Sequence, residues 1–128
     1  MGDLTKNFSR SEFACSCGCD LIAVDFSLVT ALQNGVDYFT AKYNQKVSCI
    51  ITSGNRCPDC NKAAGGAENS THLLCLAVDH KFFLKQTGHQ IEPEEVAQYY
   101  EKTFPESSGI GRYSNRTHFD TRIKKARW

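Results

Sequence analysis

The sequence predicts an α+β fold in which a small antiparallel sheet is flanked by helices. Two apolar patterns with helical spacing alternate with short runs of strand-forming residues, in the order helix, strand, long loop, strand, helix, hairpin. The chain has 128 residues, of which 41% are hydrophobic and 23% are charged. These values are typical of a globular protein, and we expect a single domain over residues 1–128.

The first helix and the first strand are predicted between residues 25 and 53. Apolar residues recur at every third or fourth position, as on one helical face: Leu28, Leu32, Val36, Phe39 and Tyr43. Asp25 precedes this stripe and is a suitable N-cap. The next segment, KVSCIITS at residues 46–53, is apolar and β-branched, which predicts a buried strand.

A long loop is predicted to follow this strand. Its sequence, SGNRCPDCNKAAGGAENS at residues 53–70, is rich in turn-forming residues, and a short helix is expected after Pro58. Long loops in compact domains are often functional. The run LCLAVDHKFF at residues 74–83 then predicts the second strand.

The last third of the chain predicts a helix and a hairpin. Pro93 opens the helix, and its expected buried side consists of Val96, Tyr100 and Phe104. The segments GIGRYSN and THFDTRI predict two short strands joined by a turn at Ser114 and Asn115. The basic end of the chain, residues 122–128, is expected to be a solvated tail.

Charge and hydropathy exclude two classes of function. The net charge is +1 and no basic cluster is present, which argues against nucleic-acid binding. No apolar run reaches the roughly 20 residues of a membrane span, so no membrane insertion is expected. The first residues lack the apolar core of a signal peptide, which indicates cytoplasmic synthesis without an export signal. We expect a monomer.

Seven cysteines form two groups. Cys49 and Cys75 lie within apolar runs and are expected to be small core residues. The other five are Cys15, Cys17, Cys19, Cys57 and Cys60. Three alternatives remain open for them: a structural zinc site with four cysteine ligands, a disulfide between the N-terminal segment and the loop, or free thiols.

One set of side chains has the composition of a zinc site. Side chains alternate along a strand, so His118, Asp120 and Arg122 are expected on one face. His72 precedes the second strand, and Asp79 lies within it. Two imidazoles and one carboxylate suit Zn²⁺ and leave a fourth position for water. By spacing alone the signal is weak, because a single His or Asp at a strand end is more often structural.

Longer motifs carry a resemblance to a known family. The segments SGNRCPDCNKAAGGAENSTHLLCLAVD and GIGRYSNRTHFDTR, the terminal ARW and the opening NFSRSEFACSCGC resemble the M15 family of zinc peptidases. That family has the hedgehog/D-Ala-D-Ala peptidase fold. Its members cut peptides of bacterial cell walls that contain D-amino acids, as carboxypeptidases or as phage endolysin-type endopeptidases.

The resemblance implies a role for five residues. His72, Asp79 and His118 match the zinc ligands, Arg56 matches an arginine that binds a substrate carboxylate or carbonyl, and Ser70 matches a substrate-contacting hydroxyl. A zinc-dependent metallopeptidase that acts on peptidoglycan stem peptides of the cell wall is therefore expected. The bond that is cut, D-Ala-D-Ala or L-Ala-D-Glu, and an origin in a cell or a phage stay open.

The sequence departs from the family at two positions. Cys75 stands where the family usually has glycine, and Asn115 stands where many members carry an acidic general base. Asp120 is the nearest acid and is the candidate catalytic residue, or else it orients His118. Two further functions stay open. One is a zinc-containing wall-binding or phage structural module with little or no activity, and the other is a cysteine–zinc interaction domain.

Overall fold

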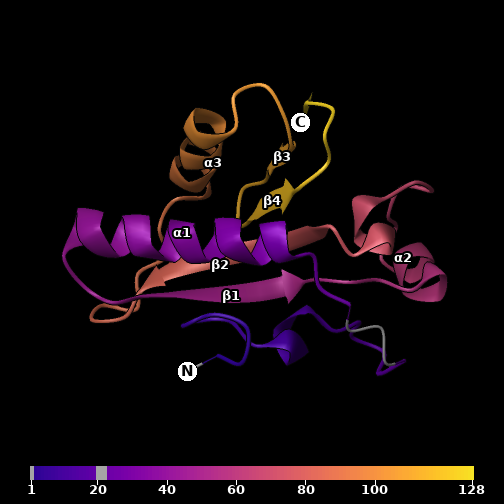
Figure 1. Ribbon diagram of the computed structural model, residues 1–128, viewed down its shortest axis with the longest axis horizontal. Coiled ribbons are helices and arrows are strands. Elements are labelled where there is room, and N and C mark those ends of the chain that lie inside the picture. The colour runs from indigo at the N-terminus through magenta and orange to yellow at the C-terminus, as the bar shows by residue number, and fades with distance from the viewer. Residues whose placement is uncertain (1, 20–22) are drawn as a thin grey trace.

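The structure is a computed structural model that describes residues 2–19 and 23–128. It has the predicted α+β fold (Figure 1). The helices are α1 (Phe26–Tyr43), α2 (Pro58–Ala63) and α3 (Pro93–Thr103), with short 3₁₀ helices η1 (Arg10–Phe13) and η2 (Thr71–Leu74). The strands are β1 (Val47–Ser53), β2 (Ala77–Leu84), β3 (Gly109–Arg112), β4 (Thr117–Asp120) and β5 (Ala126–Arg127). Within these residues, no helix is long and apolar enough to cross a membrane.

The sheet is mixed because of its last strand. The strand order is β1-β2-β4-β3-β5, and every neighbouring pair is antiparallel except β3 and β5. The prediction of a solvated tail was therefore wrong, since Ala126 and Arg127 pair with β3. The Arg127 guanidinium donates hydrogen bonds to the carbonyls of Phe104 and Ser108. This charged group therefore has hydrogen-bond partners within the folded chain and does not need to extend into solvent.

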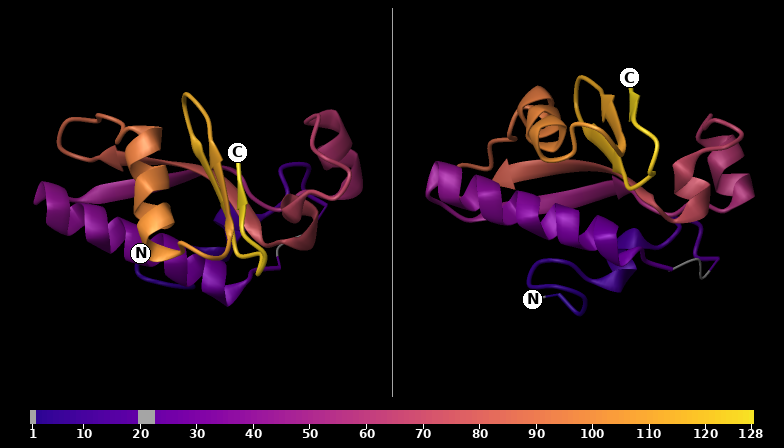
Figure 2. Two further views of the ribbon diagram at one scale, coloured as in Figure 1. Left: turned by 90° about the horizontal axis from the view of Figure 1, so that it is seen from above. Right: turned by 45° about the horizontal axis from the view of Figure 1, so that its top comes forward.

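Helices α1 and α3 both pack on one face of the sheet (Figure 2). The predicted N-cap of α1 is confirmed, because the Asp25 carboxylate accepts a hydrogen bond from the Leu28 amide at 3.0 Å. On α1, the ring of Phe39 lies 5.5 Å from that of Phe82 on β2. The opposite face of β2 and β4 is called the polar face here, because it carries Asp79, Lys81, His118 and Asp120 beside Ala77 and Phe83, as strand alternation requires.

A buried polar pair lies within this apolar layer. His80 of β2 is fully buried, and its Nε2 atom lies 2.7 Å from the hydroxyl of Tyr100 on α3. Burial lowers the pKa of His80 to about 4, so the ring is neutral at neutral pH. The Tyr100 ring also stacks on Phe119 of β4, with centroids 4.2 Å apart. Tyr100 thus joins α3 to two strands by both its ring and its hydroxyl.

The N-terminal segment packs against the loop that follows β1 (Figure 1). The Asn55 amide donates a hydrogen bond to the carbonyl of Phe13 at 2.9 Å. Gly54 allows this approach, because a Cβ atom at that position would lie 2.8 Å from the Phe13 carbonyl oxygen. Phe8 and Phe13 are buried in the hydrophobic core, so this segment is an integral part of the fold.

The second strand begins later than the sequence predicts. Residues 71–74 form η2, which ends at Cys75 in the left-handed conformation with φ of 60°. Such a backbone favours glycine, which fits the residue expected there from the family resemblance. Cys75 is half-buried and lies outside the core, so its assignment as a core residue was wrong. Cys49 does pack against the core.

We expect the Tyr100→Phe substitution to lower the free energy of unfolding by about 1–3 kcal/mol, because it leaves Nε2 of the buried His80 without a partner. Urea unfolding followed by circular dichroism measures the change. Tyr38→Phe is the matched control, since Tyr38 on α1 is 43% exposed, and its effect should stay within about 0.5 kcal/mol. Equal losses in both variants would contradict a role for the Tyr100 hydroxyl.

Candidate metal centre

Three of the side chains singled out in the sequence come together on the polar face of the sheet. His72, Asp79 and His118 each offer one ligand atom, and these atoms lie within 4.8 Å of one another. The three residues are only 3–5% exposed. Asp79 Oδ1 lies 2.9 Å from His118 Nδ1 and 3.4 Å from His72 Nε2. The carboxylate oxygen therefore lies between the two imidazoles.

The sheet register and a turn position these residues. Asp79 and His118 are directly paired across β2 and β4, so their side chains stand beside each other on one face. His72 lies in η2, immediately before β2. The Ser70 hydroxyl caps η2 by accepting a hydrogen bond from the His72 amide at 3.2 Å. Residues far apart in the sequence are thus fixed by main-chain pairing rather than by flexible loops.

Each histidine is oriented through its second ring nitrogen. His72 Nδ1 lies 2.7 Å from the Gly54 carbonyl, which can only accept, so Nδ1 carries the proton and Nε2 faces Asp79. His118 Nε2 lies 2.8 Å from Asp120 Oδ2, which leaves Nδ1 to face Asp79. Metal-binding histidines are commonly held in this way by a carbonyl or a carboxylate. The donor set and its orientation fit Zn²⁺.

Asp120 is fully buried and hydrogen-bonded on both oxygens. Oδ1 accepts from the amides of Gly109 and Arg122 and from Arg122 Nε. Oδ2 accepts from the Thr71 hydroxyl and Arg122 Nη2, and it contacts His118 Nε2. Although burial acts to raise it, the hydrogen bonds from His118 and Arg122 hold the pKa of Asp120 well below its usual range. Asp120 is therefore an ionised hydrogen-bond acceptor on the side of the His118 ring that faces away from Asp79.

A carboxylate contacts each ring nitrogen of His118, Asp79 at Nδ1 and Asp120 at Nε2. Burial acts to lower the pKa of His118, but hydrogen bonds to Asp120 and Asp79 raise it above its usual value. Burial acts to raise the pKa of Asp79, and the hydrogen bonds from His118 and His72 hold it well below its usual range. The two carboxylates thus stabilise the protonated form of the His118 ring.

The cluster borders an open pocket of about 410 Å³ that is also lined by three arginines, Arg56, Arg116 and Arg122. Arg56 Nη2 lies 3.5 Å and Arg116 Nε 3.7 Å from Asp79 Oδ2. The Arg56 side chain is braced by a hydrogen bond from its Nε to the Ser53 hydroxyl at 3.0 Å. Because guanidinium groups are always charged and bind carboxylates through two N–H groups, this pocket suits an anionic ligand.

The remaining sequence predictions are located by the structure but are not tested by it. Ser70 lines the pocket, although its hydroxyl also caps η2. Asn115 lies in the turn between β3 and β4, where its carboxamide oxygen accepts from Arg116. Among the described residues, Asp79 is the only carboxylate that lines this pocket. Asp120 is not one of the described lining residues, and it contacts the centre through His118 Nε2.

The sequence reasoning missed several residues at the centre. Arg116 lies two positions before His118, so strand alternation could have placed it on the same face. The Trp128 ring packs on His118 with centroids 4.7 Å apart, and the Gly54 carbonyl orients His72. Both residues lie in segments that carry the family resemblance, but their contacts could not be predicted from local patterns because these contacts depend on the three-dimensional fold.

Comparisons with known proteins give one match. The family described as peptidase M15 has a sequence model that matches residues 6–120, which is most of the chain and includes the whole histidine and aspartate cluster. Neither the curated proteins nor the solved structures that were compared contain a match.

We expect Asp120→Asn to weaken zinc binding by roughly 10–100-fold, because a neutral amide accepts more weakly from His118 and turns an NH₂ group toward Arg122. Competition with a chromophoric chelator measures this affinity. The same measurement on the His72→Ala protein gives the zinc that is bound outside the histidine and aspartate cluster, which is then subtracted. Asp37→Asn, on the exposed side of α1, is the control. If Asp120 is instead the general base, zinc affinity stays unchanged and kcat falls by about 10²–10⁴-fold.

Proposed function

This chain belongs to the peptidase M15 family, and from that premise we propose that it is a zinc metallopeptidase of bacterial peptidoglycan. Its substrates would be stem peptides, and the bonds cut would involve D-amino acids. Peptidases of this family are zinc enzymes. The observation that carries the proposal is the buried cluster of two imidazoles and one carboxylate, in which both imidazoles are already oriented.

His72, Asp79 and His118 are the proposed zinc ligands. When bound there, Zn²⁺ would supply a Lewis acid that polarises a peptide carbonyl and acidifies a water molecule. The protein contributes the geometry, since Asp120 and the Gly54 carbonyl hold the two imidazole rings. Asp120 is proposed to be a positioning residue, because it is fully buried and hydrogen-bonded on both oxygens.

Arg56 is the proposed binding group for a substrate carboxylate. Its side chain is 16% exposed, borders the pocket and is braced by Ser53, so little conformational freedom is lost when a ligand binds. Arg116 also lies beside the Asp79 carboxylate and would add positive charge to the pocket. Stem peptides offer such groups at the terminal D-Ala and at D-Glu. Ser70 is proposed to contact the peptide backbone from the rim of the pocket.

A second candidate function rests on Asn115. This residue cannot take a proton from water, and Asp79 is the only carboxylate among the described pocket residues. A protein with an intact zinc site and no efficient base would bind wall peptides with little or no hydrolysis. The cell-wall-binding or phage structural module therefore stays as the alternative.

Digestion of purified muropeptides, followed by liquid chromatography and mass spectrometry, tests the proposal. We expect zinc-dependent products, and their masses identify the bond. Release of D-Ala indicates a carboxypeptidase, and separation of the sugar-linked L-Ala from the rest of the stem peptide indicates an endopeptidase that cuts L-Ala-D-Glu. The His72→Ala protein is the inactive control. Retention of the wild-type protein on peptidoglycan without any product would reject the peptidase and support the binding module.

Arg56→Ala should lower kcat/KM by about 10–100-fold, the cost of one or two lost charge-assisted hydrogen bonds to the substrate. Its zinc content should stay unchanged. Arg10→Ala is the control, because Arg10 is exposed in the N-terminal segment and away from the pocket. If Arg56→Ala loses the metal, Arg56 supports Asp79 rather than the substrate.

A further inference from the structure

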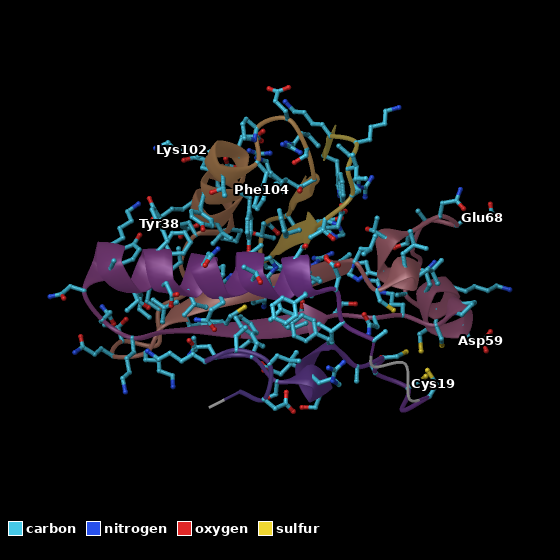
Figure 3. The ribbon with its side chains drawn as sticks, viewed as in Figure 1. Cys19, Tyr38, Asp59, Glu68, Lys102 and Phe104 are labelled. Carbon is cyan, nitrogen blue, oxygen red and sulfur yellow. The ribbon has the colours of Figure 1, made fainter. Side chains whose placement is uncertain are left out.

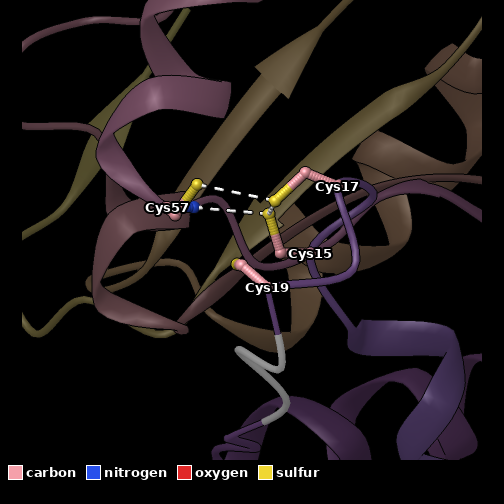
Figure 4. A group of neighbouring side chains, drawn as sticks. All are labelled: Cys15, Cys17, Cys19 and Cys57. Carbon is pink, nitrogen blue, oxygen red and sulfur yellow. Dashed lines mark hydrogen bonds between the residues drawn. The ribbon is translucent and has the colours of Figure 1, made fainter.

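A second cluster of potential metal ligands lies outside the pocket, at the end of the molecule where Cys19 and Asp59 are found (Figure 3). Cys15, Cys17 and Cys19 come from the N-terminal segment, and Cys57 comes from the loop after β1 (Figure 4). One sulfur atom from each of the four lies within 4.8 Å of the others. Segments that are about 40 residues apart in the sequence thus bring four thiols to one point.

The spacing of the sulfur atoms is that of a tetrathiolate site. Cys17 Sγ lies 3.5 Å from Cys15 Sγ and 3.8 Å from Cys57 Sγ. In a tetrahedral zinc site with Zn–S bonds of about 2.3 Å, the sulfur atoms are about 3.8 Å apart. A disulfide would require about 2.05 Å. No disulfide joins any of the seven cysteines, all of which fall within the described residues.

The backbone supports convergence of the thiols. Gly18 has a φ of 75° and donates its amide hydrogen to the Cys15 carbonyl, which reverses the chain between Cys17 and Cys19. The Cys57 amide donates to Cys15 Sγ at 3.5 Å. A backbone N–H directed at sulfur stabilises the thiolate, which is the form that binds metal.

We propose that Cys15, Cys17, Cys19 and Cys57 bind a second, structural zinc ion that fastens the N-terminal segment to the loop carrying Arg56. Four thiolates without an open position are the ligand set of structural zinc, in contrast to the histidine and aspartate cluster. The near-neutral net charge of the chain separates this site from the zinc ribbons that bind nucleic acid.

The four residues from Gly54 to Cys57 connect the thiol cluster with the proposed peptidase site. The Gly54 carbonyl accepts from His72, the Asn55 amide donates to Phe13, and Arg56 contacts Asp79. Cys57 follows immediately, in the thiol cluster. A zinc ion at Cys57 would therefore fix one end of the segment that orients His72 and presents Arg56.

Native mass spectrometry of the zinc-loaded protein tests the proposal by stoichiometry. We expect two zinc ions in the wild-type protein, one in His72→Ala, one in Cys17→Ser and none in the double variant. Cys75→Ser is the matched control and should keep both ions, since Cys75 lies outside both clusters. Cys60→Ser tests the choice of ligands, because the Cys60 thiol also interacts with those of Cys15, Cys17 and Cys57. We expect this variant to keep both ions, since Cys60 is not among the four residues whose sulfur atoms all lie within 4.8 Å of one another.

Cobalt substitution gives a readout that does not depend on the folding of a cysteine variant. With Co²⁺ in the His72→Ala protein, we expect the intense thiolate-to-metal charge-transfer bands of a tetrahedral thiolate site. Limited proteolysis should cleave the segment around Arg56 faster after this ion is removed by a chelator, whether or not the protein is a peptidase.

Two results would overturn the proposal. One is a wild-type protein that binds a single zinc ion and keeps it in Cys17→Ser. The other is a metal-free protein whose cysteines resist alkylation until a reductant is added, which would identify a disulfide between the two segments. Loss of zinc in Cys60→Ser but not in Cys19→Ser would overturn the assignment of Cys19 as a ligand.

Discussion

The direct pairing of Asp79 with His118 across two antiparallel strands is the constraint on which the candidate metal centre depends. A one-residue slip between β2 and β4 would turn one of these side chains toward the helices. The register is held by the apolar face, where Val78 pairs with Phe119 and both residues are fully buried. The polar face can therefore carry two carboxylates and two imidazoles, because the opposite face supplies the hydrophobic stabilisation.

Regular patterns allowed much of this arrangement to be predicted. The stripe beginning at Leu28 gave α1 and its cap, and strand alternation correctly put His118 and Asp120 on one face, where they are hydrogen-bonded. Local patterns could not predict the left-handed turn at Cys75, because cysteine is not a typical turn residue. This turn is the reason why β2 begins later in the sequence than predicted. Nor could local patterns predict β5, because the Arg127 guanidinium is hydrogen-bonded to carbonyls that lie about 20 residues earlier in the sequence.

The centre also shows why its residues cannot be assigned roles from composition alone. Two aspartates lie near the histidines, yet they differ in their surroundings. Asp79 faces the pocket, whereas Asp120 is enclosed by donors from Thr71, Gly109 and Arg122. These hydrogen bonds are the reason why Asp120 is proposed to orient His118. The distinction depends on burial and on partners that only the folded chain brings together.

The long sequence separation between β2 and β4 has a consequence for biosynthesis. His118 and Asp79 are 39 positions apart, with α3 and β3 between them, and such nonlocal pairs form late in folding. The ribosome makes Cys57 and all cysteines before it well ahead of His118. A nascent chain can therefore bring its four clustered thiols together first. The histidine and aspartate cluster is completed only after the β3–β4 hairpin has been made. A hydrolase assembled in this order lacks a complete candidate metal centre until the ribosome has made the strand that carries His118.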